Sequence, residues 1–173
     1  RHFKIISGAH RVSLSWLNMT GGNVGSNDGG SIYVYNVAAH LNISHCVFFN
    51  NRAGGSGGAI YAGDGQANLF FTFARFTENK ADGSGGAVYL YNGKLVDHSS
   101  MYNMNTAGHY GGALSLHDGS HSSFFNSSLV SNTARYRGGG IYIESYWYSS
   151  VSSFLNMSSV TLQSNKQIGG GTT

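Results

Sequence analysis

The stretch Asn51-Arg-Ala-Gly-Gly-Ser-Gly-Gly-Ala-Ile-Tyr61 returns 28 residues later as Asn79-Lys-Ala-Asp-Gly-Ser-Gly-Gly-Ala-Val-Tyr89. Looser copies of this phrase, an Asn with a glycine pair close behind it, follow one another along the whole chain. The repeated Asn recurs at steps of 28, 28, 26, 27 and 33 residues: Asn23, Asn51, Asn79, Asn105, Asn132 and Asn165. A period of this size indicates a stack of similar supersecondary units.

Short runs of alternating apolar and polar residues fill each repeat, which is typical of strands. Directly after the glycine pairs, one apolar position is expected to share an inner face: Ile32, Ile60, Val88, Leu114 and Ile141. A second strand precedes each Asn, and a third lies further upstream. Three strands and three turns in one repeat predict one coil of a parallel β-helix. We therefore expect an all-β, right-handed parallel β-helix of about six coils, each of 26–33 residues.

The repeated Asn has a physical reason to recur in phase. An Asn side chain inside a tight turn can hydrogen-bond to the same turn in the coils above and below, so that no buried backbone group is left without a partner. We predict such a ladder from Asn23, Asn51, Asn79, Asn105, Asn132 and Asn165. The glycine pairs are expected to form cramped corners and not phosphate sites, since no Gly-Lys-Ser/Thr sequence follows them.

Composition excludes several classes of protein. Charged residues make up only 10% of the chain, proline is absent, and the net charge is +3. No basic run interleaved with aromatic residues suggests a nucleic-acid module, and no apolar run is long enough to span a membrane. The single cysteine, Cys46, allows no intrachain disulfide. No cofactor site is expected, and residues 1–173 are expected to form one β-helix segment of a longer solenoid or of a filament subunit.

Two surface features suggest function. Four Asn-x-Ser/Thr sequons predict N-glycosylation in a secreted protein: Asn18, Asn42, Asn126 and Asn156. Alternation also sends one set of tyrosines outward as a stripe: Tyr33, Tyr61, Tyr89 and Tyr142. This stripe could stabilise the sheet by stacking, or contact glycans or a partner protein.

An enzyme of the polysaccharide lyase or hydrolase kind is a further alternative, because such enzymes place acids on neighbouring coils. Only seven carboxylates are present, and Asp64 and Asp118 share a coil position two coils apart. A second group, Asp97-His98 with His117-Asp118 and His121, matches no recognised metal-ligand spacing. We therefore predict no catalytic and no metal residues.

The pairing of Phe-x-x-Asn with Gly-Gly-Ala-Ile resembles the repeats of chlamydial polymorphic outer-membrane proteins, also seen in secreted algal and protist proteins. It stands here as Phe48-Phe-Asn-Asn51 with Gly57-Gly-Ala-Ile60, and in related form up to Gly138-Gly-Gly-Ile141. The resemblance implies a β-helix on a cell surface and brings no shared active site.

The leading hypothesis is an extracellular or cell-surface scaffold that is glycosylated and assembles head to tail into fibres. The partners would be further copies of the chain or other matrix and surface proteins. A surface adhesin or carbohydrate-binding module that uses the tyrosine stripe is the alternative.

Overall fold

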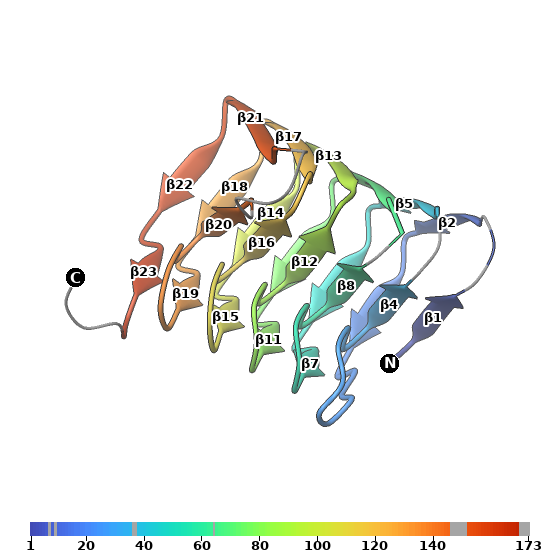
Figure 1. Ribbon diagram of the computed structural model, residues 1–173, viewed down its shortest axis with the longest axis horizontal. Helices are drawn as coiled ribbons and strands as arrows, with labels where there is room; N and C mark the ends of the chain where they lie inside the picture. Colours follow the sequence, from blue (N-terminus) through green and yellow to red (C-terminus); the bar gives the residue numbers. More distant parts are fainter. Residues whose placement is uncertain (7, 9, 36–37, 64, 146–151, 170–173) are drawn as a thin grey trace.

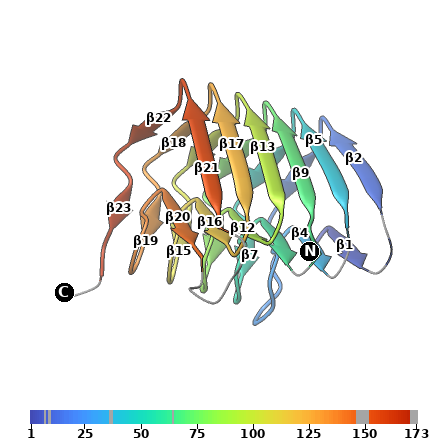
Figure 2. The ribbon, with the colours of Figure 1, turned by 45° about the horizontal axis from the view of Figure 1, so that its top comes forward.

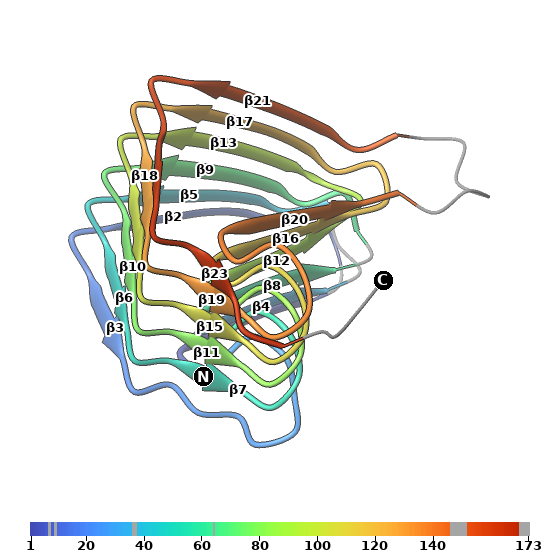
Figure 3. The same ribbon diagram turned by 90° about the vertical axis from the view of Figure 1, so that its left-hand side faces the viewer.

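The computed structural model describes residues 1–6, 8, 10–35, 38–63, 65–145 and 152–169. In this part of the chain, short parallel strands wind into a solenoid, with β1 near one end and β23 near the other (Figure 1). Figure 3 looks along the axis from the C-terminal end, where the chain runs anticlockwise as it advances toward the viewer. This is the right-handed sense that the repeat predicted. The described residues contain no helix that could cross a membrane.

Four parallel sheets run along the axis, and we name them A to D. Sheet A contains β1 (Phe3–Ile6), β4 (Ile32–Tyr35), β8 (Ile60–Gly63), β12 (Val88–Tyr91), β16 (Leu114–His117) and β20 (Ile141–Glu144). Sheet B, prominent in Figure 2, contains β2 (Arg11–Ser15), β5 (His40–Ser44), β9 (Asn68–Thr72), β13 (Lys94–His98), β17 (His121–Phe125) and β21 (Phe154–Ser158).

Sheet C follows sheet B around each coil and contains β3 (Asn18–Thr20), β6 (Val47–Phe49), β10 (Arg75–Thr77), β14 (Met101–Asn103), β18 (Ser128–Val130) and β22 (Thr161–Gln163). Sheet D contains β7 (Arg52–Ala53), β11 (Lys80–Ala81), β15 (Thr106–Ala107), β19 (Thr133–Ala134) and β23 (Lys166–Gln167). Six strands in three sheets and five in the fourth correspond to about five complete turns and a partial one, close to the six coils expected.

The register expected from the sequence is confirmed in sheet A, where Ile32 pairs with Ile60, and Val88 pairs with Leu114. The prediction of three strands per coil was wrong, because sheet D adds a fourth. Its members are only two residues long, too short to show an alternating pattern.

The core lies between sheets A, B and C, and its side chains stack in rows along the axis. The rings of Phe48, Phe76 and Tyr102 have no exposed surface and stack at centroid distances of 4.7 and 4.9 Å. Cys46 is also fully buried, as expected of a small core residue. Stacking of equivalent side chains on successive coils therefore fills the interior.

Left-handed backbone is used at several corners, and only some of them carry glycine. The first glycine of each pair has this conformation, as at Gly57 (φ 67°), where a Cβ would collide with the carbonyl oxygen of Ile60. The glycine pairs are therefore steric corners. The turn between sheets B and C is left-handed in every coil without any glycine: Trp16, His45, Phe73, Ser99, Asn126 and Ser159.

Most variation in repeat length falls in the connection from sheet A to sheet B. This connection spans residues 36–39, 64–67, 92–93, 118–120 and 145–153 in successive coils. Its lengthening in the last coil accounts for the 33-residue step. The hydrogen-bonded part of the coil therefore keeps a nearly constant length.

Candidate functional site

A ladder of buried Asn side chains runs along the corner between sheets C and D. In every member but the last, Nδ2 donates to a carbonyl of the preceding coil and to Oδ1 of the next Asn, as Asn79 does with Phe48 (2.9 Å) and Asn105 (3.0 Å). Asn165, the half-buried last member, donates to the Leu129 carbonyl at 2.8 Å. The members are Asn51, Asn79, Asn105, Asn132 and Asn165. All of their described bonds are internal, so this row is structural.

Asn23 does not belong to this ladder, contrary to expectation. Its side chain is exposed, and its backbone pairs with Arg52, one position past the ladder. The ladder position of the first coil is Gly22, whose N–H donates to Asn51 Oδ1 at 2.9 Å. One extra residue between Gly22 and the first glycine pair shifted the sequence-based alignment.

The four sequon asparagines are all exposed: Asn18, Asn42, Asn126 and Asn156. Asn42 and Asn156 lie in the same outward row of sheet B, as the register of β5, β9, β13, β17 and β21 shows. Asn126 lies at a left-handed turn, where its Nδ2 donates to Ser99 Oγ at 3.2 Å. Exposure makes each side chain accessible to a glycan, and glycosylation itself remains a prediction.

The predicted tyrosine stripe is half-buried on the outward side of sheet A. Tyr33, Tyr61 and Tyr89 stack on one another with centroids 5.4 and 5.1 Å apart. At the next coil, where the sequence has Ser115, the ring of His117 takes the missing place, 4.8 Å from Tyr89 and 5.7 Å from Tyr142. The rings thus form one continuous stacked row, in which much of each ring face is covered by its neighbours. This favours the interpretation that the tyrosines stabilise the sheet over the interpretation that they bind a ligand.

Two neighbours fix the His117 ring. Ser115 Oγ lies 2.7 Å from Nε2, and Glu144 Oε2 lies 3.3 Å from Nδ1. This is the order of groups in a Ser-His-acid triad, but Ser115 has no exposed surface, so a substrate carbonyl cannot reach its oxygen. Burial lowers the pKa of His117, opposed by the carboxylates of Glu144 and Asp118. The neutral His117 ring, held by Ser115 and Glu144, therefore acts as one member of the stacked aromatic row on sheet A.

The structure does not bring together the acid and histidine groups that were considered, and not predicted, as catalytic or metal sites. Asp64 lies outside the described residues, and Asp118 is buried. His98 and His121 are exposed on sheet B, whereas Asp97 points into the core. In the described ranges, no group of three or more His, Cys, Asp or Glu side chains could hold a metal ion.

Asp97 is a fully buried carboxylate, which the sequence analysis did not predict. Its Oδ2 accepts a hydrogen bond from Tyr102 at 2.5 Å, and its Oδ1 accepts from Ser127 at 2.5 Å and from the Ser100 N–H at 3.3 Å. Burial raises the pKa of Asp97, and these donors partly oppose the shift. Burial and the neighbouring carboxylate also raise the pKa of Tyr102. The group is enclosed, so its role is in the core.

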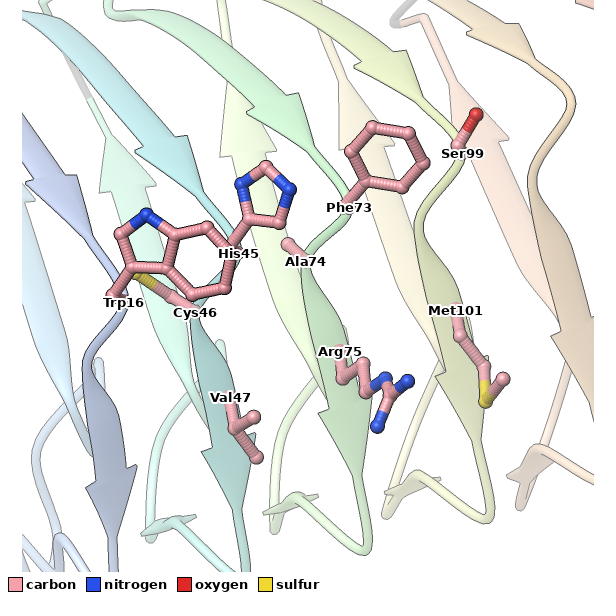
Figure 4. A pocket seen from close by; sticks show the side chains of 9 residues that line it. All are labelled: Trp16, His45, Cys46, Val47, Phe73, Ala74, Arg75, Ser99 and Met101. Carbon is pink, nitrogen blue, oxygen red and sulfur yellow. The ribbon is translucent and has the colours of Figure 1, made fainter.

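An open groove of about 440 Å³ runs along the corner between sheets B and C (Figure 4). Aromatic side chains from successive left-handed turns line one side, and the outward row of sheet C lines the other. The lining residues are Trp16, His45, Cys46, Val47, Phe73, Ala74, Arg75, Ser99 and Met101. Trp16 stacks on His45 at 4.2 Å, and His45 lies 5.1 Å from Phe73.

The groove belongs to a wider apolar surface on sheet C and its two flanking turns, formed by Trp16, Phe49, Phe73, Met101 and Met104, which are 40–76% exposed. Aromatic residues, Met and Arg are the types enriched in binding surfaces, and bulky side chains in left-handed backbone cost free energy. The sequence analysis missed this surface. The signal was available, because Trp16, His45 and Phe73 each stand three residues before an inward residue of sheet C.

Comparison with known proteins identifies the repeat. The model of the Chlamydia polymorphic membrane protein repeat matches residues 45–63 and 74–91. The chain resembles the polymorphic membrane protein repeat proteins. Both matched stretches contain a strand of sheet C, the ladder Asn, the glycine pair and a strand of sheet A. No curated protein and no solved structure matches the chain.

The polymorphic membrane protein repeat is associated with bacterial outer-membrane and surface proteins and is not an enzyme family. Together with the β-solenoid, it suggests a surface-type repeat protein.

Proposed function

We propose that the chain is an extracellular structural β-solenoid that acts as a scaffold, carries N-linked glycans and stacks end to end. The observation that carries the proposal is that each described coil covers the inward side chains of the coil before it, so that coils of this type are complementary to one another. In the last described coil, Ile143, Met157 and Leu162 are 38–53% exposed and line an open apolar hollow of about 580 Å³ with Asn165. Their counterparts in the preceding coil, such as Leu116 and Leu129, are fully buried.

This coil-shaped surface would be covered by another coil of the same type. Parallel strand edges and an open Asn ladder accompany the apolar side chains, so a second copy could continue both the sheets and the core. The sequon asparagines are exposed and do not belong to the buried core. Glycans on them would leave the stacking direction open and keep the lateral surface soluble.

Electron microscopy of the purified protein tests the proposal. We expect filaments in which coils continue across subunit boundaries, and we expect Leu162→Glu to abolish them by placing a charge in the stacked core. The matched control is Phe49→Glu, which changes an exposed apolar residue on the lateral surface. Single rods in the unmodified protein, or filaments that survive Leu162→Glu, would contradict end-to-end stacking.

The adhesin alternative is supported by a different surface from the one that the sequence suggested. The stacked tyrosines are half-buried, whereas the groove beside Trp16, Phe73 and Arg75 is open. A carbohydrate or protein ligand at this groove should be lost in Phe73→Ser and retained in Tyr61→Ser. If a ligand-binding screen instead showed that binding is lost in Tyr61→Ser and retained in Phe73→Ser, the tyrosine stripe would be the binding surface.

A further inference from the structure

Two exposed aromatic residues stand in a fixed relation to two of the sequons. Trp16 and Phe154, at 76% and 57% exposed, are the most exposed Phe, Trp or Tyr side chains in the described part of the chain. Each lies two residues before a sequon Asn, in Trp16-Leu-Asn-Met-Thr20 and Phe154-Leu-Asn-Met-Ser158. Both stretches therefore have an aromatic residue, an Asn and a hydroxyl residue at every second position.

The backbone places these side chains on one surface. Phe154, Asn156 and Ser158 all lie in β21, and all three are exposed. Residues two apart in a strand point to the same face and are separated by about 7 Å. In the first coil, Trp16 lies at a left-handed turn (φ 58°), and Asn18 begins β3, again with both side chains exposed. A sugar on either Asn can lie back across the preceding ring.

From these positions we propose that Asn18 and Asn156 carry N-linked glycans whose first N-acetylglucosamine packs on Trp16 and Phe154, respectively. The proposal rests on the glycosylation included in the proposed function and adds the contact that orders the glycan. The C–H groups on one face of a pyranose ring form an apolar surface that fits an aromatic face, while the hydroxyls remain in water. This contact would cover ring surface that the described neighbours, His45 for Trp16 and His121 for Phe154, leave exposed.

The other two sequons lack this arrangement. Asn126 also follows an aromatic residue by two positions, but Phe124 occupies an inward position of β17 and is fully buried. The chain turns at Asn126 (φ 54°), so the Asn side chain is nevertheless exposed. Asn42 follows His40. The sequence pattern around Asn126 thus looks the same as that around Asn156, and only the structure separates them. Asn126 is therefore an internal control within the same molecule.

A double-mutant cycle on protein secreted from a eukaryotic host tests the contact. Glycopeptide mass spectrometry gives the occupancy of each sequon, and the glycans are then trimmed to one sugar. We expect Trp16→Ala to lower the melting temperature by about 1–5 °C more in the sugar-bearing protein than in an Asn18→Gln background. Tyr35→Ala, which removes an exposed ring on sheet A away from any sequon, should show no such coupling to Asn18→Gln.

A second measurement needs no change at Trp16. In a Trp147→Phe background, Trp16 is the remaining indole, and the sugar on Asn18 should reduce its quenching by acrylamide at least about twofold relative to Asn18→Gln. Equal quenching, or no coupling in the cycle, overturns the proposal. Empty Asn18 and Asn156 beside occupied Asn42 or Asn126 would overturn it and leave the glycosylated scaffold standing. Four empty sequons would overturn both.

Discussion

Two neighbouring coils fill the same volume with opposite chemistry. In one coil, Phe71 and Phe76 pack at a centroid distance of 5.3 Å, with Ala74 at the corner between them. In the next coil, the same three positions are Asp97, Tyr102 and Ser100, and the Tyr102 hydroxyl donates to the carboxylate at 2.5 Å. Both sets are almost completely buried.

The difference shows that the coil geometry does not require an apolar core at every level. The rings of Phe76 and Tyr102 still stack, with their planes 4° apart, so the polar set keeps the aromatic row and adds a hydroxyl. The polar set requires that every buried polar group has a hydrogen-bond partner, because a buried carboxylate without donors costs free energy. Asp97 has donors from Tyr102, Ser127 and the Ser100 N–H.

The largest effect is expected from placing an acid in the apolar coil. Phe71→Asp would leave a carboxylate among apolar side chains, one coil away from Asp97 and without the donors that Asp97 has. We expect the free energy of unfolding to fall by at least about 4 kcal/mol, measured by urea denaturation. Phe73→Asp is the control, because Phe73 is exposed and should change stability by less than about 0.5 kcal/mol. Equal losses in the two variants would contradict the comparison.

Removing one donor from the polar coil should have a smaller effect. Tyr102→Phe keeps the ring stack but deprives Asp97 Oδ2 of its hydrogen bond, and we expect a loss of about 1–3 kcal/mol in the same measurement. Tyr35→Phe removes a hydroxyl from an exposed tyrosine and should be nearly neutral. An unchanged stability in Tyr102→Phe would mean that the carboxylate does not depend on this donor.

The two coils should also differ in their response to pH. Because burial raises the pKa of Asp97 above 3.8, the native state keeps a proton that the unfolded chain has already released. Stability should therefore fall as the pH rises from 3.8 through the raised pKa.

His117, which lies in a different coil, acts with the opposite sign. Burial lowers its pKa below 6.5, so stability falls as the pH drops below that value.

Replacement of both polar residues isolates the Asp97 contribution. The free energy of unfolding of Asp97→Phe/Tyr102→Phe, relative to that of the unmodified protein, should rise between about pH 3 and pH 7. Denaturation at each pH measures this difference. A difference that stays constant with pH would contradict a raised pKa for Asp97.

The smallest effect on the free energy of unfolding is expected from the same double variant when it is compared with the unmodified protein at a single pH. It copies the Phe71 and Phe76 pair, and Ser127 can still donate to the carbonyl of Phe125 at 3.2 Å. Replacing a buried polar pair by apolar side chains is often close to neutral, so we expect a change within about 1.5 kcal/mol of the unmodified protein. A loss as large as that of Phe71→Asp would show that the polar set is required.

The sequence predicts the repeated part of this fold well. Alternation and the glycine pairs placed Ile32, Ile60 and Val88 in one inward row, because each coil repeats the same local pattern. Features that depend on one coil alone were missed. The extra residue in the first coil displaced Asn23, and His117 replaces an absent tyrosine from two positions away.

The apolar surface around the groove could not be predicted from the sequence, because it depends on a backbone conformation that the stacked coils impose. Left-handed backbone is normally read from Gly, Asn or Asp, whereas Trp16, His45 and Phe73 adopt it because the stacked coils impose the turn. The burial of Asp97 was not predicted, because its donors come from Tyr102 and Ser100 in its own coil and from Ser127 in the following coil. Only the assembled stack brings these groups together.

The connection between sheets A and B has a consequence for how such a chain could evolve or be engineered. It lengthens from two to nine residues while the strands on either side keep their pairing. Loops grafted at this connection in successive coils would stand side by side at the inter-strand spacing of about 4.8 Å. The solenoid could thus acquire a row of independently variable recognition loops, much as an antibody carries its loops on a constant framework.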